Sequence, residues 1–302
     1  GSEMCIRDRY VLDLVPQSII DGTDFLSDIA LAFIAFSTGE FFKLSTLKKN
    51  GLAVVWVTVL EAVLASVFVF VLTFFVLRLD LAFSIVLAAL ASATAPASTM
   101  MTIRQTGAKG DFVDTLLQVV ALDDVVGLVL YSVAISIALA SAAGGSGFSL
   151  RTLAQPVILN LLVLALGGVF GLFMKLLMPQ KRSTDNKLII SIALLFTFCG
   201  ACTLLDVSPL LGCMMMGTVY TNIAEDDKLF KQLNYFSPPI LLLFFVRSGM
   251  SFRLDALFSA AGNLDGVPLL VIGVGYFFVR ILGKYAGAWL GCRLVGKPPL
   301  VR

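Results

Sequence analysis

Residues 112–130 read FVDTLLQVVALDDVVGLVL, an apolar run with two adjacent aspartates, Asp123 and Asp124, near its middle. An apolar run of this length predicts a helix that crosses a membrane. Each ionisable group at that depth costs on the order of 2.5–3.5 kcal/mol by insertion scales, so such groups are kept mostly where they line a water-filled path and bind something. The aspartate pair therefore indicates an ion transporter.

The composition extends this interpretation to the whole chain of 302 residues, which is 58% hydrophobic and only 14% charged, with a mean hydropathy of +0.95. A soluble domain carries about 25% charged residues. Long apolar stretches recur along the sequence and predict an all-α, polytopic membrane protein. Nine spans are expected, at residues 24–42, 51–77, 81–104, 112–142, 153–178, 187–206, 208–223, 235–250 and 266–294.

The chain is expected to form a single transmembrane domain over residues 24–302. Residues 1–23 are interpreted as a non-native or poorly ordered segment, because Gly1–Arg9 are polar and differ from the apolar sequence of the spans. The net charge of +2 gives no indication of nucleic-acid binding.

The third span contains the sequence ASATAPAST at residues 91–99, with a proline among small and hydroxylated residues. Proline removes a backbone donor, so the carbonyls near Ser92 and Ala93 lose their helical partners. Broken backbone at membrane depth is tolerated where it is buried in protein or lines a cavity, and in transporters it supplies carbonyls to the ion site. The alternative is a simple kink satisfied by Ser and Thr side chains. We expect a broken helix at Ala95, Pro96 and Ser98.

The last span carries two cations, Arg280 and Lys284, which lie four residues apart and therefore share a helix face. Arg280 lies near the middle of the span and requires an acidic partner, for which Asp123 and Asp124 are the obvious choices. Lys284 lies nearer the end of the span. Its side chain can either pair with an aspartate or extend to the membrane surface.

The spans also contain a third acidic residue and a repeat of glycines. Glu61 lies in the second span, where it is interpreted either as an accessory site or as the partner of a cation. Gly283, Gly287 and Gly291 repeat every four residues in the last span, a pattern that predicts close helix packing.

No motif of an enzyme is visible: the sequence shows no nucleophile–base pair, metal triad or phosphate-binding loop, and no cofactor is expected. The chain has no histidine, so proton binding near neutral pH falls to carboxylates or lysines.

Five segments of the chain form a familiar series: SATAPA at 92–97, IRQTGAKG at 103–110, LDD at 122–124, FFVRSGM at 244–250 and VRILGK at 279–284. Together they resemble the monovalent cation:proton antiporter superfamily, and the likeness extends from about residue 24 to the end. The two-aspartate form is similar to the electrogenic sodium/proton antiporter branch of this superfamily.

This resemblance implies a fold of inverted repeats, of which the chain would be a fragment lacking helices at both ends. It also implies exchange of Na⁺ or Li⁺ for protons by alternating access, in a homodimer embedded in the lipid bilayer of a bacterial-type inner or plasma membrane. The alternatives are a potassium/proton efflux transporter of the ligand-gated type and a non-transporting membrane sensor subunit with the same fold.

The resemblance also assigns roles to residues. Asp124 would bind the proton and, transiently, the transported Na⁺, with Thr94 at the first helix crossing beside it. Asp123 would pair with the cation of the last span, best matched by Arg280 with Lys284 as the alternative.

Overall fold

The computed structural model divides the chain into two compact units. The first unit holds residues 1–43 and 161–253, and the second unit holds residues 44–160 and 254–302. The described residues are 24–44, 52–94, 99, 102–103, 105–142, 150–179, 183–205, 207–224, 227–251, 263–264 and 266–296.

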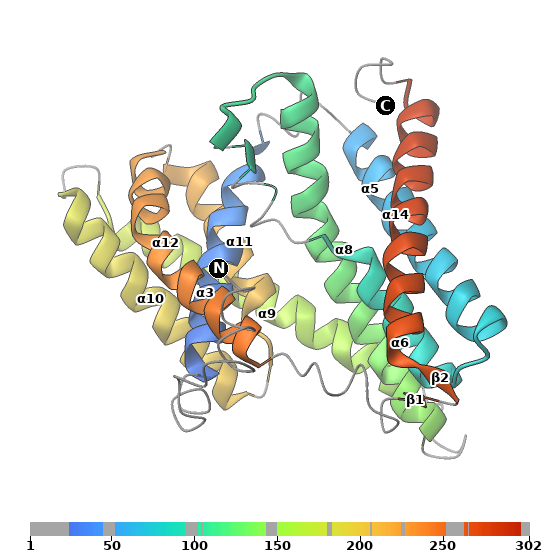
Figure 1. Ribbon diagram of the computed structural model, residues 1–302. Helices are drawn as coiled ribbons and strands as arrows, with labels where there is room; N and C mark the ends of the chain where they lie inside the picture. The colour runs from blue at the N-terminus through green and yellow to red at the C-terminus, as the bar shows by residue number, and fades with distance from the viewer. Residues whose placement is uncertain are drawn as a thin grey trace. The chain divides into compact units, whose positions relative to one another are not determined.

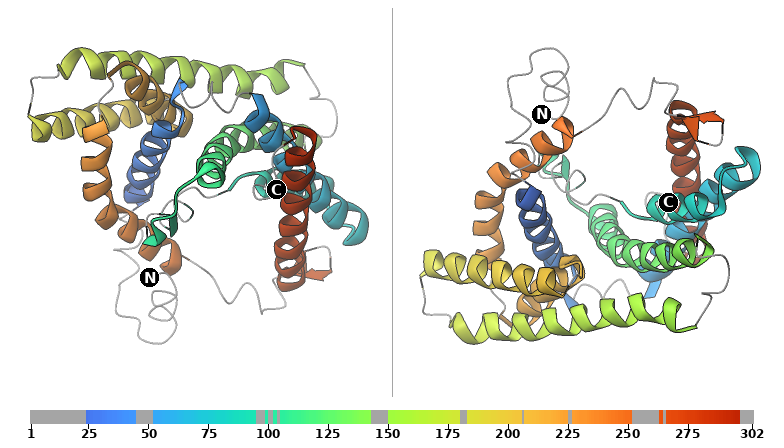
Figure 2. Two further views of the ribbon diagram at one scale, coloured as in Figure 1. Left: turned by 90° about the horizontal axis from the view of Figure 1, so that it is seen from above. Right: turned by 90° about the horizontal axis from the view of Figure 1, so that it is seen from below.

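The second unit is built around helix α5 (Leu52–Phe70), which continues into the π-helical turn η3 (Val71–Val76). Helix α5 packs against three neighbours, and two of these also pack against each other, α6 against α8 (Figure 1 and Figure 2). The three neighbours are α6 (Leu81–Ser92), α8 (Asp111–Ala142) and α14 (Leu269–Leu294). A two-residue ladder of β1 (Asn263–Leu264) and β2 (Val267–Pro268) precedes α14.

The glycines of α14 form a seam with α5. A Cβ atom added at any of the three would lie within 2.8 Å of an α-carbon of α5. The two backbones therefore touch and run antiparallel, which confirms the predicted role of the small residues in close helix packing. The facing pairs are Gly283 with Ala65, Gly287 with Glu61, and Gly291 with Val57.

The first unit has an aromatic interior. Helix α3 (Asp24–Thr38) continues into the short helix η2 (Gly39–Phe41) and packs against α10 (Thr184–Leu204), α11 (Leu210–Ala224) and α12 (Asp227–Met250). The rings of Phe36 and Phe230 are stacked with their centroids 5.3 Å apart, and the ring of Tyr220 lies 6.2 Å from that of Phe230. These rings are buried and join α3, α11 and α12 into one core.

Helix α9 (Leu150–Leu177) begins in the second unit and ends in the first. Its Gly171 lies against α11, because a Cβ atom added there would be 2.9 Å from the carbonyl oxygen of Met216.

The described helices confirm the expected all-α, polytopic fold. Each predicted span coincides with one of them, and five helices are long and apolar enough to cross a membrane. Three others are apolar but shorter, at residues 81–92, 210–224 and 235–250. Two helices differ in length from their spans: α6 ends at Ser92, inside the predicted interruption of the span 81–104, and α12 begins at Asp227, before the predicted span 235–250. The early start of α12 is explained by packing, since Leu229, Phe230 and Leu233 are buried.

Candidate functional site

The site starts at the C-terminal end of α6, in the second unit. The helix ends at Ser92, and Ala93 has an extended backbone with φ −72° and ψ 145°. The last carbonyls of a helix have no partners within it, and they carry the negative end of the helix dipole. The break therefore presents several backbone oxygens in the interior of the unit. Ala95, Pro96 and Ser98, where the break was predicted, lie outside the described residues.

Arg280 of α14 binds these free carbonyls. Its Nε donates to the carbonyl oxygen of Ala91 at 3.1 Å, and its Nη2 donates to that of Ala93 at 2.5 Å. Arg280 was the preferred predicted partner of Asp123, with Lys284 as the alternative, but its hydrogen bonds within the described residues go to backbone oxygens. The physical reason is that a planar guanidinium spans two carbonyls at once, and the end of a helix attracts a cation.

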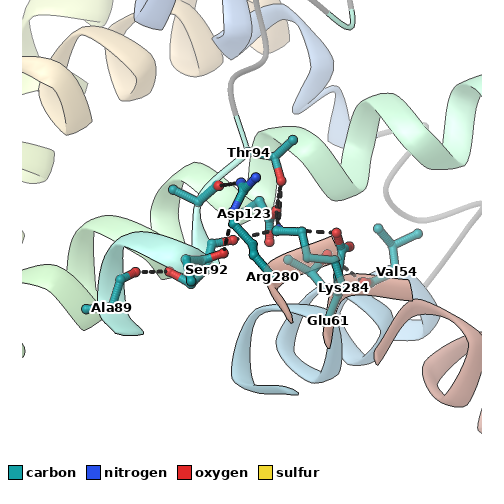
Figure 3. A network of polar contacts seen from close by, with 11 residues as sticks. Val54, Glu61, Ala89, Ser92, Thr94, Asp123, Arg280 and Lys284 are labelled. Carbon is teal, nitrogen blue, oxygen red and sulfur yellow. Dashed lines mark hydrogen bonds and ion pairs between the residues drawn. The ribbon is translucent and has the colours of Figure 1, made fainter. Parts of the chain in front are cut away.

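Lys284, one turn further along α14, points into a group of four oxygens (Figure 3). Its Nζ lies 2.5 Å from Asp123 Oδ2, 2.6 Å from the carbonyl oxygen of Ser92, 2.7 Å from Thr94 Oγ1 and 3.2 Å from Glu61 Oε1. An ammonium has three N–H donors, so at least one of them is shared. Lys284 rather than Arg280 is thus the partner of Asp123, and its side chain does not extend to the membrane surface.

Asp123 is fully buried, with a side chain that is 0% exposed. Its Oδ2 accepts hydrogen bonds from Lys284 and, at 2.5 Å, from the hydroxyl of Thr94. Its Oδ1 is buried and has no hydrogen-bond partner among the described residues. A buried oxygen without a partner is costly. Asp123 therefore has one oxygen held in place and one with capacity to accept a proton or coordinate a cation.

Asp124 is the next residue on the same helix, but its side chain leaves the helix in a different direction from that of Asp123, because successive residues of an α-helix are turned by about 100°. Its side chain is half-buried, and it forms no hydrogen bond or ion pair with any residue in the described part of the chain. The two aspartates that look alike in the sequence are thus different in the structure. One is fixed by a lysine and a threonine, and the other is not.

Two residues contribute to the site in ways that the sequence analysis did not settle. Glu61, for which two roles were open, reaches Lys284 from α5 and forms an ion pair with it. Gly127 was not singled out; a Cβ atom there would lie 2.8 Å from the Cβ atom of Ala93. The signal was its position four residues after Asp123, on the same face of α8, where a small residue lets the broken end of α6 approach.

The family described as "sodium/hydrogen exchanger, transmembrane" matches residues 9–299 of the chain. This range starts earlier than residue 24, where the resemblance was expected to begin. Among 17 matching chains of solved structures is the sodium proton antiporter MjNhaP1 from Methanocaldococcus jannaschii at pH 8. It superposes with a TM-score of 0.68 at 20% sequence identity, covering 96% of this chain and 71% of that chain. At this identity the likeness concerns the fold alone. No curated protein sequence matches the chain.

Proposed function

The chain belongs to the family of transmembrane sodium/hydrogen exchangers, and on that premise we propose that it exchanges Na⁺ or Li⁺ for protons by alternating access. It is an integral, multi-pass membrane protein. The observation that supports the proposal best is Oδ1 of Asp123, which is buried and has no hydrogen-bond partner in the described part of the chain, next to the half-buried carboxylate of Asp124.

In the proposed site, the carboxylate of Asp124 binds the transported cation. Carboxylate, hydroxyl and carbonyl oxygens are ligands that hard cations prefer. Oδ1 of Asp123, the hydroxyl of Thr94, carbonyls at the end of α6 and water are available to complete the shell. The protein groups come from α8 and from the end of α6, so the site depends on the break in α6.

Protons and cations compete in this proposal for the same carboxylate. A proton on Asp124 removes its negative charge and occupies an oxygen that would otherwise coordinate the cation. The cation in turn neutralises the carboxylate and lowers its affinity for a proton. Mutual exclusion at one site, combined with exposure of that site to each side of the membrane in turn, is sufficient for exchange.

The assembly and the membrane are also part of the proposal. From the resemblance we infer a homodimer in a bacterial-type inner or plasma membrane, in which a mobile core moves past a dimerisation domain. The lipid bilayer solvates the apolar helix faces, which carry many exposed large side chains such as Leu161, Phe173 and Phe277.

The test uses the full-length protein reconstituted into liposomes that contain a pH-sensitive dye. We expect an imposed Na⁺ gradient to drive proton movement, and lowering the pH to raise the apparent KM for Na⁺ without changing the rate at saturating Na⁺. The variant Asp124→Asn should lose this exchange, whereas Asp114→Asn, an exposed carboxylate on the same helix, should retain it. Undiminished exchange in Asp124→Asn would reject the assignment of the binding carboxylate. Absence of any Na⁺-driven flux in the unmodified protein would favour a sensor subunit.

A further inference from the structure

We propose that Glu61 is a second counter-ion of Lys284, which retains the ammonium group when a transported cation occupies the aspartates and so sets the affinity for that cation. The inference rests on the proposed exchange function and adds a residue to it. Glu61 acts through Lys284 and is therefore a positioning residue.

The geometry places Lys284 between two carboxylates from different helices (Figure 3). Its Nζ lies 2.5 Å from Oδ2 of Asp123 on α8 and 3.2 Å from Oε1 of Glu61 on α5. The side chains of Lys284 and Glu61 are 14% and 13% exposed, so water screens their attraction only weakly. The ammonium can shift toward Glu61 without leaving the group of oxygens that surrounds it.

Glu61 is held at this depth by the glycine seam. Its backbone touches Gly287 of α14, where an added Cβ atom would lie 2.5 Å from the α-carbon of Glu61. Lys284 precedes Gly287 by three residues on α14, so the two residues are neighbours on the helix surface. Contact between the α5 and α14 backbones thus fixes the carboxylate of Glu61 beside the ammonium of Lys284.

A second counter-ion has a clear consequence for cation binding. A cation on the aspartates repels Lys284 and weakens its bond to Asp123. A buried ammonium left without a partner is strongly unfavourable, and this cost would be subtracted from the affinity for the cation. With Glu61 in place, Lys284 keeps one carboxylate throughout the cycle.

The balance of charge leads to the same conclusion. When all groups are ionised, the site holds three carboxylates (Glu61, Asp123 and Asp124) and two cations (Arg280 and Lys284), which leaves one excess negative charge. One monovalent cation neutralises the cluster. Without Glu61 the empty cluster is already neutral, and a bound cation leaves an excess positive charge in the interior.

The experiment compares Glu61→Gln, Glu61→Asp and the control Asp114→Asn in the full-length protein reconstituted into liposomes. We expect Glu61→Gln to raise the apparent KM for Na⁺ by about tenfold or more, with little change in the rate at saturating Na⁺. Glu61→Asp keeps the charge and should recover most of the affinity, and Asp114→Asn should leave the KM unchanged. A purely structural role would instead lower the maximal rate by reducing the amount of folded protein, at unchanged KM.

A second measurement does not depend on transport. The Na⁺ concentration that gives half of the maximal thermal stabilisation in detergent should rise for Glu61→Gln in the same proportion as the KM. In the background of Lys284→Gln the substitution should have a much smaller effect, because its partner is absent.

Three results would overturn the inference: an unchanged KM in Glu61→Gln, a loss of maximal rate alone, or an equal effect in both backgrounds, which would indicate simple charge removal. If Lys284→Gln does not fold, the KM of Glu61→Asp decides: a KM near that of the unmodified protein supports the inference, and a KM as high as that of Glu61→Gln contradicts it. Failure of the proposed function is distinct, because the unmodified protein would then show no Na⁺-driven flux.

Discussion

The interiors of the two units differ, although both pack helices through glycine. In the first unit the Cβ position of Gly39 lies 2.6 Å from the backbone nitrogen of Thr218, as close as the contacts of the α5–α14 seam in the second. Most of the largest fully buried side chains described, among them Phe36, Tyr220 and Phe230, belong to the first unit. The second unit instead surrounds a group of carboxylates and cations with small residues.

The described part of the first unit shows that helices of this protein pack together without a buried cluster of charged side chains. Helices of similar length pack in the first unit with aromatic side chains at their contacts. A buried ion pair is weak evidence for stability, since apolar residues of similar volume often stabilise as well or better. The cluster of the second unit is therefore weak evidence for a role in folding, and it agrees with the proposed role in ion binding.

The largest expected effect comes from removing the cation of the cluster. In Lys284→Met, the carboxylates of Asp123 and Glu61 lose their shared partner, and the free energy of unfolding should fall by about 3–5 kcal/mol. Denaturant titration in detergent micelles measures this change. Acidification should reduce the loss, because protonated carboxylates no longer require a cation.

Lys175→Met is the matched control, because Lys175 is exposed on α9. Its effect should stay within about 0.5 kcal/mol. Equal losses of stability for the two variants would show that the carboxylates of Asp123 and Glu61 do not depend on Lys284 as their shared partner.

A smaller effect is expected at the glycine seam. Gly287→Ala forces a methyl group against the backbone of Glu61, and the resulting overpacking should cost about 1–3 kcal/mol and raise the KM for Na⁺ by displacing Glu61. Gly273→Ala on the same helix meets no atom within 4 Å and should stabilise the helix by about 0.5–1 kcal/mol. Thermal unfolding and exchange assays on both variants measure these effects. Equal changes in stability and KM for the two variants would contradict the close contact of α5 and α14 at Gly287.

The smallest effect is expected in the first unit. Phe230→Leu keeps most of the apolar volume but loses the stacked ring on Phe36, which should cost about 0.5–1.5 kcal/mol. The KM for Na⁺ should not change, because Phe230 lies outside the proposed ion site. If Phe230→Leu shifted the KM as much as Glu61→Gln does, the proposed difference in function between the two units would be wrong.

Much of this architecture could be predicted from the sequence because its signals are local. Apolar stretches indicated the helices, most of them to within a few residues, since the cost of exposing backbone and polar groups to lipid acts on every residue separately. The repeat of Gly283, Gly287 and Gly291 indicated a packing face, and the motif around residue 93 indicated that a helix would break. Burial of Asp123 was expected from the apolar run around it.

The pairing of cations with carboxylates could not be predicted from local sequence patterns. Arg280 and Lys284 lie on one face of one helix, and both can pair with a carboxylate. Which of them meets Asp123 depends on the depth and rotation of α14 relative to α8, and these are set by contacts between residues more than 150 positions apart. The ion pair between Lys284 and Glu61 depends on the same seam. The sequence by itself determined that charges are buried in these helices, and the tertiary structure decided which charge neutralises which, because electrostatic pairing depends on distances that only packing defines.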